Sequence, residues 1–412
     1  MNKTVAVIER NDRLGGHINT YVDPATNRTF DYGVVVWDNT TVVRDYFADL
    51  DVPLGPSSFG GSEVSLLVNF ANGSVAPASV LSQGNATAAF LTYSEQLTKY
   101  PYLVNGFNLP DPVPQDLLLA WGEFIQKYNL SALAYTAFEY NQGIGNTLAQ
   151  PTLYMLKYFP ASTVNGILTG SFVTTAHRDN QELYDRALAR LGSDGFISSN
   201  VSRVIRRGDG TDVYMSTPEG PKLIRASKLL ITIPPKLSNL GFLDVDPVER
   251  SLFGQFNNSY YWDAVLKSSG IPDNTSLSNV DPAAPYALPP MPGIYGFGPV
   301  ADFPGLHTVY YSSPHSMTDD EVKADILATN ARLVKTLGYP ALNATPEFVG
   351  FNAHNPFELT VSTQAISDGF YGRLEALQGR RQTWWTGAAW QAQDSSAIWS
   401  FTEDVILPKL KA

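Results

Sequence analysis

The chain contains no cysteine, and this absence excludes several kinds of chemistry at once. Disulfide bonds, thiolate zinc sites, iron–sulfur clusters and cysteine nucleophiles all require a sulfhydryl group. Charge is also scarce, since 16% of the residues are Asp, Glu, Lys or Arg, against a usual fraction of about 25%. Because 44% of its 412 residues are hydrophobic, the chain is expected to be globular, with a large core.

Three further kinds of pattern are missing from the sequence. The 28 basic residues are outnumbered by 39 acidic ones and form no run longer than Arg206-Arg207 and Arg380-Arg381, so nucleic acid is not an expected partner. No segment approaches the roughly 18 uninterrupted apolar residues of a membrane span. No Gly-x-Ser-x-Gly motif occurs, and no metal is expected, because four of the histidines lack metal-binding spacing: His177, His307, His315 and His354.

A short apolar strand followed by glycines opens the chain. The run from Thr4 to Glu9 ends in an acid and predicts a strand buried on both faces of a parallel sheet. An acid at the carboxyl end of such a strand can accept hydrogen bonds from ribose hydroxyls. Arg13 then supplies positive charge, and Gly15-Gly16 let the backbone come close to a diphosphate or a flat ring.

The rest of the chain alternates between strand-like and helical patterns. Helical periodicity prevails from 81 to 191 and predicts helices over 115–128 and 180–191. Strand patterns return at 196–205, 212–216, 228–233 and 383–387. Thr318 and Glu321 form a capping box that predicts a helix to about Leu337, and a last helix is expected over 395–409.

Five segments, in order along the chain, resemble one family of flavoproteins. They are Val5 to His17, Asp31-Tyr32-Gly33, Val201 with Val204 and Ile205, Ile231 to Pro235, and Trp385 to Trp399. These segments are similar to motifs of the flavin-containing amine oxidase and phytoene-desaturase superfamily of FAD oxidoreductases. Within it, the run from Trp385 to Ser396 is most similar to the fungal β-cyclopiazonate dehydrogenase group.

The resemblance implies a cofactor, a reaction and a set of site residues. FAD would accept a hydride from a small organic molecule, and the amino end of the helix at 395–398 would stabilise negative charge on the flavin. Tyr371 and Trp390 would flank the substrate as catalytic residues. The implied cofactor-binding residues are Glu9, Arg13, Gly15, Gly16, His17, Val201, Gly387, Ala388, Ser396 and Ile398.

The fold class that follows is α/β, with a discontinuous FAD-binding Rossmann-like domain and a mixed α+β substrate domain. Residues 1–70, 180–240 and 365–412 would form the first domain, and residues 71–179 and 241–364 the second. We expect the strands at 4–9 and 229–233 to share one parallel sheet. The oligomeric state is left open.

Two departures from the family pattern keep an alternative open. No Gly-x-Gly-x-x-Gly turn occurs, and Ala388 stands where many members have an acid. We expect the missing turn to lie upstream of Met1; the alternative is a truncated, catalytically silent, secreted glycoprotein. Three roles are considered for His17: a polar contact, a catalytic base or a covalent attachment point for the flavin. Four aromatic residues could stack around the flavin and the substrate or could form part of a buried core: Tyr371, Trp385, Trp390 and Trp399.

Asn-x-Ser/Thr acceptors for N-glycosylation are more frequent than chance predicts. Ten occur, against roughly three or four expected from the Ser and Thr content: Asn2, Asn27, Asn39, Asn72, Asn85, Asn129, Asn200, Asn257, Asn274 and Asn343. They predict secretion or passage through the secretory pathway. Because no signal-peptide-like stretch follows Met1, a cytoplasmic location is the alternative.

Aromatic residues in the two predicted substrate segments suggest the kind of substrate. They could line a flat, apolar pocket, or they could simply fill the core: Tyr100, Tyr102, Phe107, Tyr135, Tyr140, Tyr260, Tyr261 and Trp262. Acids are sparse there, with Glu139 alone between Lys127 and His177. An aromatic or polycyclic, amine-like metabolite is therefore expected rather than a polyamine.

Overall fold

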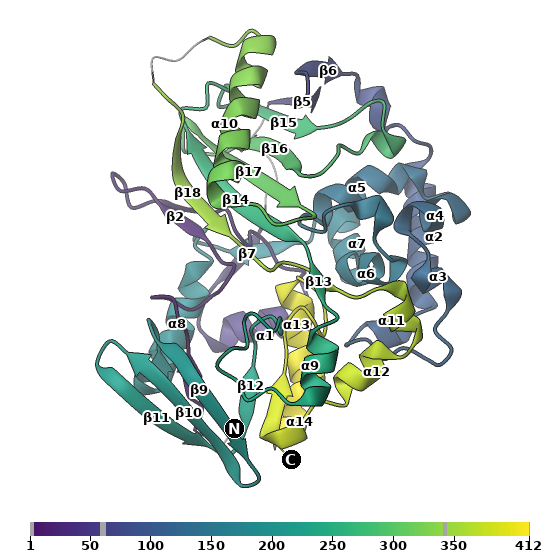
Figure 1. The fold of residues 1–412 in the computed structure, drawn as a ribbon. Coiled ribbons are helices and arrows are strands. Elements are labelled where there is room, and N and C mark those ends of the chain that lie inside the picture. Colours follow the sequence, from purple (N-terminus) through teal and green to yellow (C-terminus); the bar gives the residue numbers. More distant parts are fainter. Residues whose placement is uncertain (1–3, 58–62, 341–343, 412) are drawn as a thin grey trace.

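A computed structural model describes residues 4–57, 63–340 and 344–411. A seven-stranded sheet forms the upper region in Figure 1. Its strands, in spatial order, are β18 (Glu347–Ala353), β14 (Tyr260–Lys267), β17 (Leu306–Ser313), β16 (Gly293–Pro299), β15 (Thr275–Asn279), β5 (Val64–Asn69) and β6 (Ser74–Ala76). All neighbours are antiparallel except β15 and β5. The boundary predicted at residue 70 assigns β5 to the cofactor domain, whereas β5 lies in this upper sheet.

One long helix, α10 (Asp319–Thr336), covers a face of this sheet (Figure 1). Thr318 and Glu321 form the predicted capping box at its start. Val322, Ile326 and Leu333 belong to the same apolar cluster as sheet residues such as Trp262. Burial of this helix face therefore holds α10 on the sheet.

Short helices form the right-hand side of the molecule (Figure 1). They are α2 (Ala86–Thr98), α3 (Gln115–Leu118), α4 (Trp121–Lys127), α5 (Ala134–Tyr140), α6 (Thr152–Tyr158) and α7 (Ala161–Thr169). The single helix predicted over 115–128 was wrong, because Leu119 and Ala120 are extended. Trp121 donates its amide to Gln150 and Thr152 donates its amide to Leu119, so pairing with residues 150–152 replaces helix bonds there. No helix among the described residues is long and apolar enough to cross a bilayer.

The lower region holds both chain ends and two short parallel strand pairs (Figure 1). β1 (Val7–Ile8) pairs with β8 (Gly195–Phe196), and β12 (Leu229–Ile231) pairs with β20 (Thr383–Trp385). The expectation that β1 and β12 share one sheet was therefore wrong. The predicted burial of the first strand was also wrong at Val5, which is 48% exposed. Among the described residues, no strand pairs along the second edge of β1.

Other elements surround these pairs. They include α1 (Thr41–Asp49), β2 (Thr20–Val22), β3 (Thr29–Asp31), β4 (Leu54–Pro56), β7 (Val173–Thr175), α8 (Gln181–Leu191), α9 (Pro247–Phe253), α12 (Phe370–Glu375), α13 (Ser395–Phe401) and α14 (Leu407–Lys411). An antiparallel sheet of β9 (Asn200–Arg207), β10 (Gly210–Thr217) and β11 (Gly220–Ala226) projects at the lower left (Figure 1). The helix predicted over 180–191 is confirmed as α8.

A buried ion cluster attaches this antiparallel sheet to α9. The Arg206 guanidinium is fully buried and contacts both oxygens of Glu249 at 2.6 and 2.7 Å. Its Nε donates to Asp244 at 2.6 Å. Since Glu249 is only 1% exposed, its charge depends on Arg206 for compensation.

We expect Arg206→Leu to lower the free energy of unfolding by about 3–5 kcal/mol, because Glu249 would be left as a buried, uncompensated charge. Urea denaturation measures the loss. Arg207→Leu is the matched control, since Arg207 is 56% exposed and pairs with Asp212; its cost should be below about 1 kcal/mol. Equal losses for the two variants would contradict the importance assigned to the buried cluster.

Candidate functional site

Glu9 ends the first parallel strand in the predicted position. Its amide donates to the carbonyl of Phe196, and its own carbonyl accepts from Ser199. The half-buried carboxylate accepts the amide of Asn11 at 2.8 Å. The backbone pairing thus fixes an acid at the carboxyl end of β1, as a ribose site requires.

The glycine turn after β1 presents free donors to open space. Gly15 has φ +114° and Gly16 has φ +57°, values that favour glycine. A Cβ on Gly15 would come within 3.2 Å of the Tyr184 ring, whereas a Cβ on Gly16 would meet nothing within 4 Å. The amides of Gly16 and His17 donate to no other described group. Free amides beside open space suit an anionic or carbonyl-bearing ligand.

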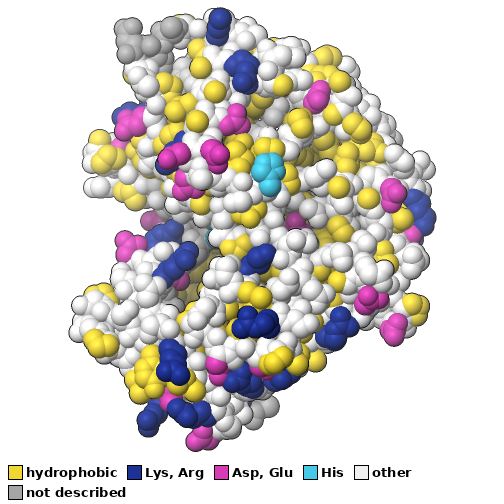
Figure 2. Space-filling view, in the orientation of Figure 1, with side chains coloured by type: hydrophobic (Ala, Val, Ile, Leu, Met, Phe, Trp, Pro, Cys, Tyr) yellow, Lys and Arg dark blue, Asp and Glu magenta, His cyan; other side chains and the backbone are white. Residues whose placement is uncertain are grey.

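Arg13 lies beside this turn without an acidic partner. Its guanidinium donates to Asn19 at 2.8 Å and to Gln181 at 3.0 Å. Among the described residues no carboxylate pairs with it, so its charge stays available to an anion. Figure 2 shows the surface hollowed on the left, between the region of α8 and β9–β11 and the region of β2 and β18, with Lys and Arg at the lower rim.

A second turn with free amides precedes α13. Gly387 has φ +115°, and the amides of Gly387 and Ala388 donate to no described group. An interaction that sequence reasoning missed lies at the helix start, where the Asp394 carboxyl accepts the amide of Ala397 at 2.6 Å. Desolvation and the neighbouring carboxyl of Asp38 raise the pKa of Asp394 to about 7. The predicted amino end of this helix is therefore capped by a carboxyl group.

The two turns are linked through one apolar cluster. Ile18 and Trp37 are buried in it, and Trp399 of α13 packs against it, with the Trp37 and Trp399 rings 6.1 Å apart. The Ser396 hydroxyl accepts the amide of Asp38 at 3.1 Å. Predicted cofactor residues from opposite ends of the chain are thereby held in one region, and Ile398 lies half-buried on the same helix.

Three other predicted residues have less direct links to this region. Val201 is half-buried on β9, opposite Met215 at a bulge in the β9–β10 pairing. Tyr371 is 1% exposed and stacks on Phe107 at 3.9 Å. Trp390 has no exposed surface and stacks on Trp385 at 5.5 Å. Tyr371 and Trp390 therefore lie in the core, which favours the core alternative over substrate contact.

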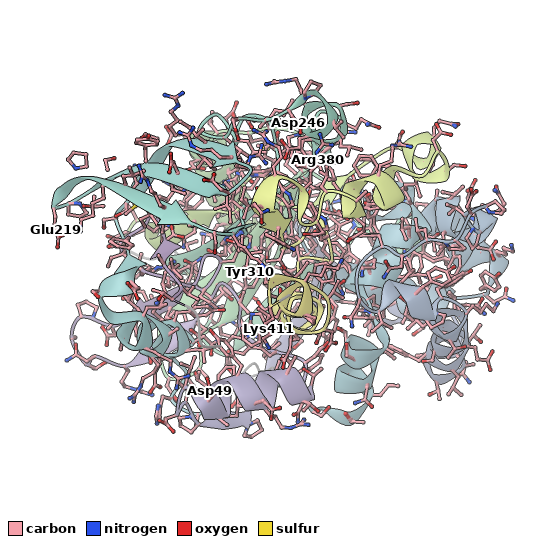
Figure 3. All side chains as sticks on the ribbon, turned by 90° about the horizontal axis from the view of Figure 1, so that it is seen from below. Asp49, Glu219, Asp246, Tyr310, Arg380 and Lys411 are labelled. Atoms are coloured by element: carbon pink, nitrogen blue, oxygen red, sulfur yellow. The ribbon has the colours of Figure 1, made fainter. Side chains whose placement is uncertain are left out.

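The predicted pocket aromatics divide in the same way. Trp262 is fully buried under α10, and Phe107 and Tyr135 lie in core clusters. Tyr261 is half-buried and packs against the same cluster as Tyr135, with its ring 4.9 Å from that of Phe357 and parallel to that of Tyr310 at 6.3 Å. Seen from below, Tyr310 lies toward the centre of the view, whereas Asp49 lies toward its edge (Figure 3).

A polar network joins the cofactor turn to the upper sheet next to Tyr261. The carboxylate of Asp263 on β14 is fully buried and accepts hydrogen bonds from His354, Asn19 and Asn352 at 2.7, 3.0 and 3.2 Å. The His17 ring lies 4.3 Å from the His354 ring. Desolvation, followed by the charge of His354, lowers the pKa of His17 to about 3. This neutral imidazole is consistent with a polar contact, and covalent attachment stays a prediction.

A buried carboxyl group, Glu358, is a further residue that the sequence did not reveal. It is 2% exposed, and neither oxygen has a hydrogen-bond partner among the described residues. Desolvation raises its pKa to about 8. Its charge would act on the hydroxyls of Tyr154, Tyr158 and Tyr371. Perturbed groups of this kind concentrate at functional sites. No metal-binding group of three or more His or acidic side chains occurs in the described part of the chain.

Curated relatives match the chain over its whole length. The FAD-dependent oxidoreductase oblC of Cochliobolus heterostrophus is 40% identical, over 100% of this chain and 86% of the relative. The chain belongs to the FAD-dependent oxidoreductases. β-Cyclopiazonate dehydrogenase of Aspergillus oryzae is 32% identical, over 98% of this chain and 87% of that enzyme. A profile of the NAD(P)-binding Rossmann-like domain matches residues 1–50.

Solved structures support the fold of this FAD-dependent oxidoreductase. The CLA-producing fatty acid isomerase from P. acnes has a TM-score of 0.77 at 19% identity and covers 98% of this chain and 92% of its own. A putrescine oxidase variant has a TM-score of 0.66 at 14% identity, with 99% and 93% coverage. The predicted superfamily, fold class and FAD cofactor are thus confirmed. The unpaired Arg13 charge and the free amides of both turns fit this cofactor.

The Gly16 position offers a direct test of cofactor contact. We expect Gly16→Ala to weaken FAD binding about tenfold or more, because a Cβ would enter the space that the cofactor would occupy. Fluorescence titration of the deflavinated protein measures the affinity.

Gly170→Ala is the matched control. Gly170 also has a positive φ, +64°, and open space at its Cβ, but it caps α7. Both substitutions should cost about 1–2 kcal/mol of stability. The cofactor assignment fails if both variants bind FAD as the parent does.

Proposed function

We propose that this FAD-dependent oxidoreductase oxidises a small aromatic or polycyclic, amine-like metabolite. A hydride would leave a C–H bond next to the nitrogen or within the ring system. When bound, FAD supplies the hydride acceptor. The observation that carries the proposal is the group of aromatic rings beside the cofactor turn, where the rings of His17 and Tyr261 both contact the ring of Phe357.

Ring contacts in this interior support a flat, apolar substrate. His17 stacks on Phe357 at 5.8 Å with an interplanar angle of 18°, and Tyr261 bridges Phe357 and Tyr310. Aromatic faces of this kind bind ring systems by offset stacking. His17, Tyr261 and Tyr310 are half-buried residues.

The carboxyl group of Glu358, next to Phe357 in the chain, does not favour a polyamine. Desolvation raises its pKa to about 8. Near neutral pH, Glu358 is therefore mainly uncharged. Such a group attracts ammonium ions weakly, whereas one amine next to an apolar body is compatible with it.

The name of one relative supports the same substrate class, because that relative is named as a dehydrogenase of β-cyclopiazonate. The structural neighbours named as putrescine oxidase and cyclohexylamine oxidase are each 15% identical and support the fold alone. A role in secondary metabolism is part of this proposal.

We expect indole or β-cyclopiazonate to perturb the bound-flavin absorbance at concentrations where spermidine and benzylamine have no effect, because the interior beside the cofactor turn is lined by aromatic rings. Anaerobic difference spectroscopy of the FAD-loaded protein measures binding and flavin reduction. A response to spermidine alone would contradict the proposed substrate class. Protein that stays colourless after incubation with FAD would favour the alternative of a catalytically silent glycoprotein.

We also propose that the protein passes through the secretory pathway. All eight glycosylation acceptors within the described residues are exposed, and two others, Asn2 and Asn343, lie outside those residues. Exposure is a requirement for a bulky glycan.

Glycosidase treatment of the protein from its native host should therefore increase its gel mobility. Unchanged mobility would contradict this location and favour a cytoplasmic one.

A further inference from the structure

We propose that His354, oriented by Asp263, accepts the proton released when the substrate is oxidised; this proposal rests on the proposed function. Oxidation next to an N–H or O–H group breaks two bonds. Bound FAD would supply the acceptor for the C–H hydrogen and its electron pair, His354 would take the heteroatom proton at Nδ1, and the substrate would gain a C=N or C=O bond. Atoms, charge and electrons then balance.

Hydrogen bonding fixes the ring of His354. Nε2 lies 2.7 Å from an oxygen of Asp263, a carboxylate that also accepts hydrogen bonds from the side-chain amides of Asn19 and Asn352. A carboxylate can only accept hydrogen bonds, so Nε2 of His354 is the donor in this contact. Nδ1 is then the ring nitrogen left to accept a proton. A buried carboxylate orients a catalytic imidazole by the same principle in hydrolases.

The second ring nitrogen of His354, Nδ1, is free of hydrogen bonds within the described part of the chain. The ring instead lies 4.3 Å from that of His17 and 5.9 Å from that of Tyr261, two half-buried residues of the proposed substrate interior. His17 does not compete for the proton, because desolvation keeps its pKa near 3.

The chain assembles this pair at the junction of its two regions. Asp263 comes from β14, His354 follows β18, and Asn19 follows the cofactor turn. The titratable and charged groups that face the pair are, besides His17, the hydroxyls of Tyr32, Tyr261 and Tyr310 and, through Asn19, Arg13. A His354–Asp263 pair that only stabilised the fold would not require Nδ1 of His354 to be free of hydrogen bonds.

The tautomer of His354 tests the proposal without any substrate. The chain has five histidines, so ¹⁵N-histidine spectra of the FAD-loaded protein can be assigned by single substitutions. We expect the neutral His354 ring to be protonated at Nε2, with a strongly deshielded proton that disappears in Asp263→Asn, and His17 to remain neutral from about pH 5 to 9. A ring protonated at Nδ1, or an unchanged signal in Asp263→Asn, would overturn the proposal.

Rapid kinetics then test proton transfer. The substrate is whichever of indole, β-cyclopiazonate, spermidine and benzylamine reduces the flavin in the binding experiment above. His354→Gln should slow anaerobic flavin reduction about 10²-fold or more, while FAD content and compound affinity change less than about threefold. Asp263→Asn should slow it as well and alter its pH profile, as expected of a positioning residue. His177→Gln, which removes an exposed histidine paired with Glu182 at 2.7 Å, is the control and should change nothing.

Parent-like flavin reduction in His354→Gln would overturn the proposal. Loss of FAD from this variant, with an unchanged reduction rate in the flavin-loaded fraction, would overturn it as well and assign His354 to cofactor binding. If no compound in the panel reduces the flavin, the proposed function fails, and the tautomer measurement alone decides on His354.

Discussion

The fully buried carboxylate of Asp263 constrains how the two regions of the molecule meet. A buried charge is costly unless donors surround it, and the three donors here come from the loop after the cofactor turn and from two positions on or after β18. The first of these, Asn19, also accepts a hydrogen bond from Arg13. Satisfying one carboxylate thus holds the segment after the glycine turn against the upper sheet, and the His17 ring contacts those of His354 and Phe357 there.

Two histidines whose rings are 4.3 Å apart acquire different properties from these surroundings. His354 has a carboxylate behind it, whereas His17 has none and faces aromatic rings, so desolvation dominates its pKa. The same contrast recurs between carboxyl groups. Asp263 is surrounded by donors, while Glu358 has no partner and its pKa rises to about 8. A buried carboxyl group to which no described residue donates, such as Glu358, has a raised pKa, whereas the donors around Asp263 compensate its burial.

Local signals in the sequence predicted the parts of the site that depend on local structure. Glu9 and the pair Gly15-Gly16 were predictable because a strand end and positive φ angles are set by neighbouring residues. The capping box at Thr318 was predictable for the same reason. Tyr371 and Trp390 could not be placed, because their burial depends on partners such as Phe107, more than 250 residues from Tyr371. The pairing that breaks the helix at Leu119 is likewise non-local, since its partners lie about thirty residues away.

The network around Asp263 marks the limit of sequence reasoning most clearly. Asp263 stands in an apolar strand, and His354 follows another strand about ninety residues later. Neither has a spacing that suggests a shared site, and the antiparallel pairing of β14 with β18 brings them together. The register of that pairing sets Asp263 opposite Asn352, so His354 follows two positions later, and alternate residues of a strand point to the same face. A shift of one residue in this register would turn Asn352 to the other face of the sheet and would leave the buried charge of Asp263 without that donor. The need to satisfy this charge is therefore also a constraint on the pairing of the strands that form the sheet.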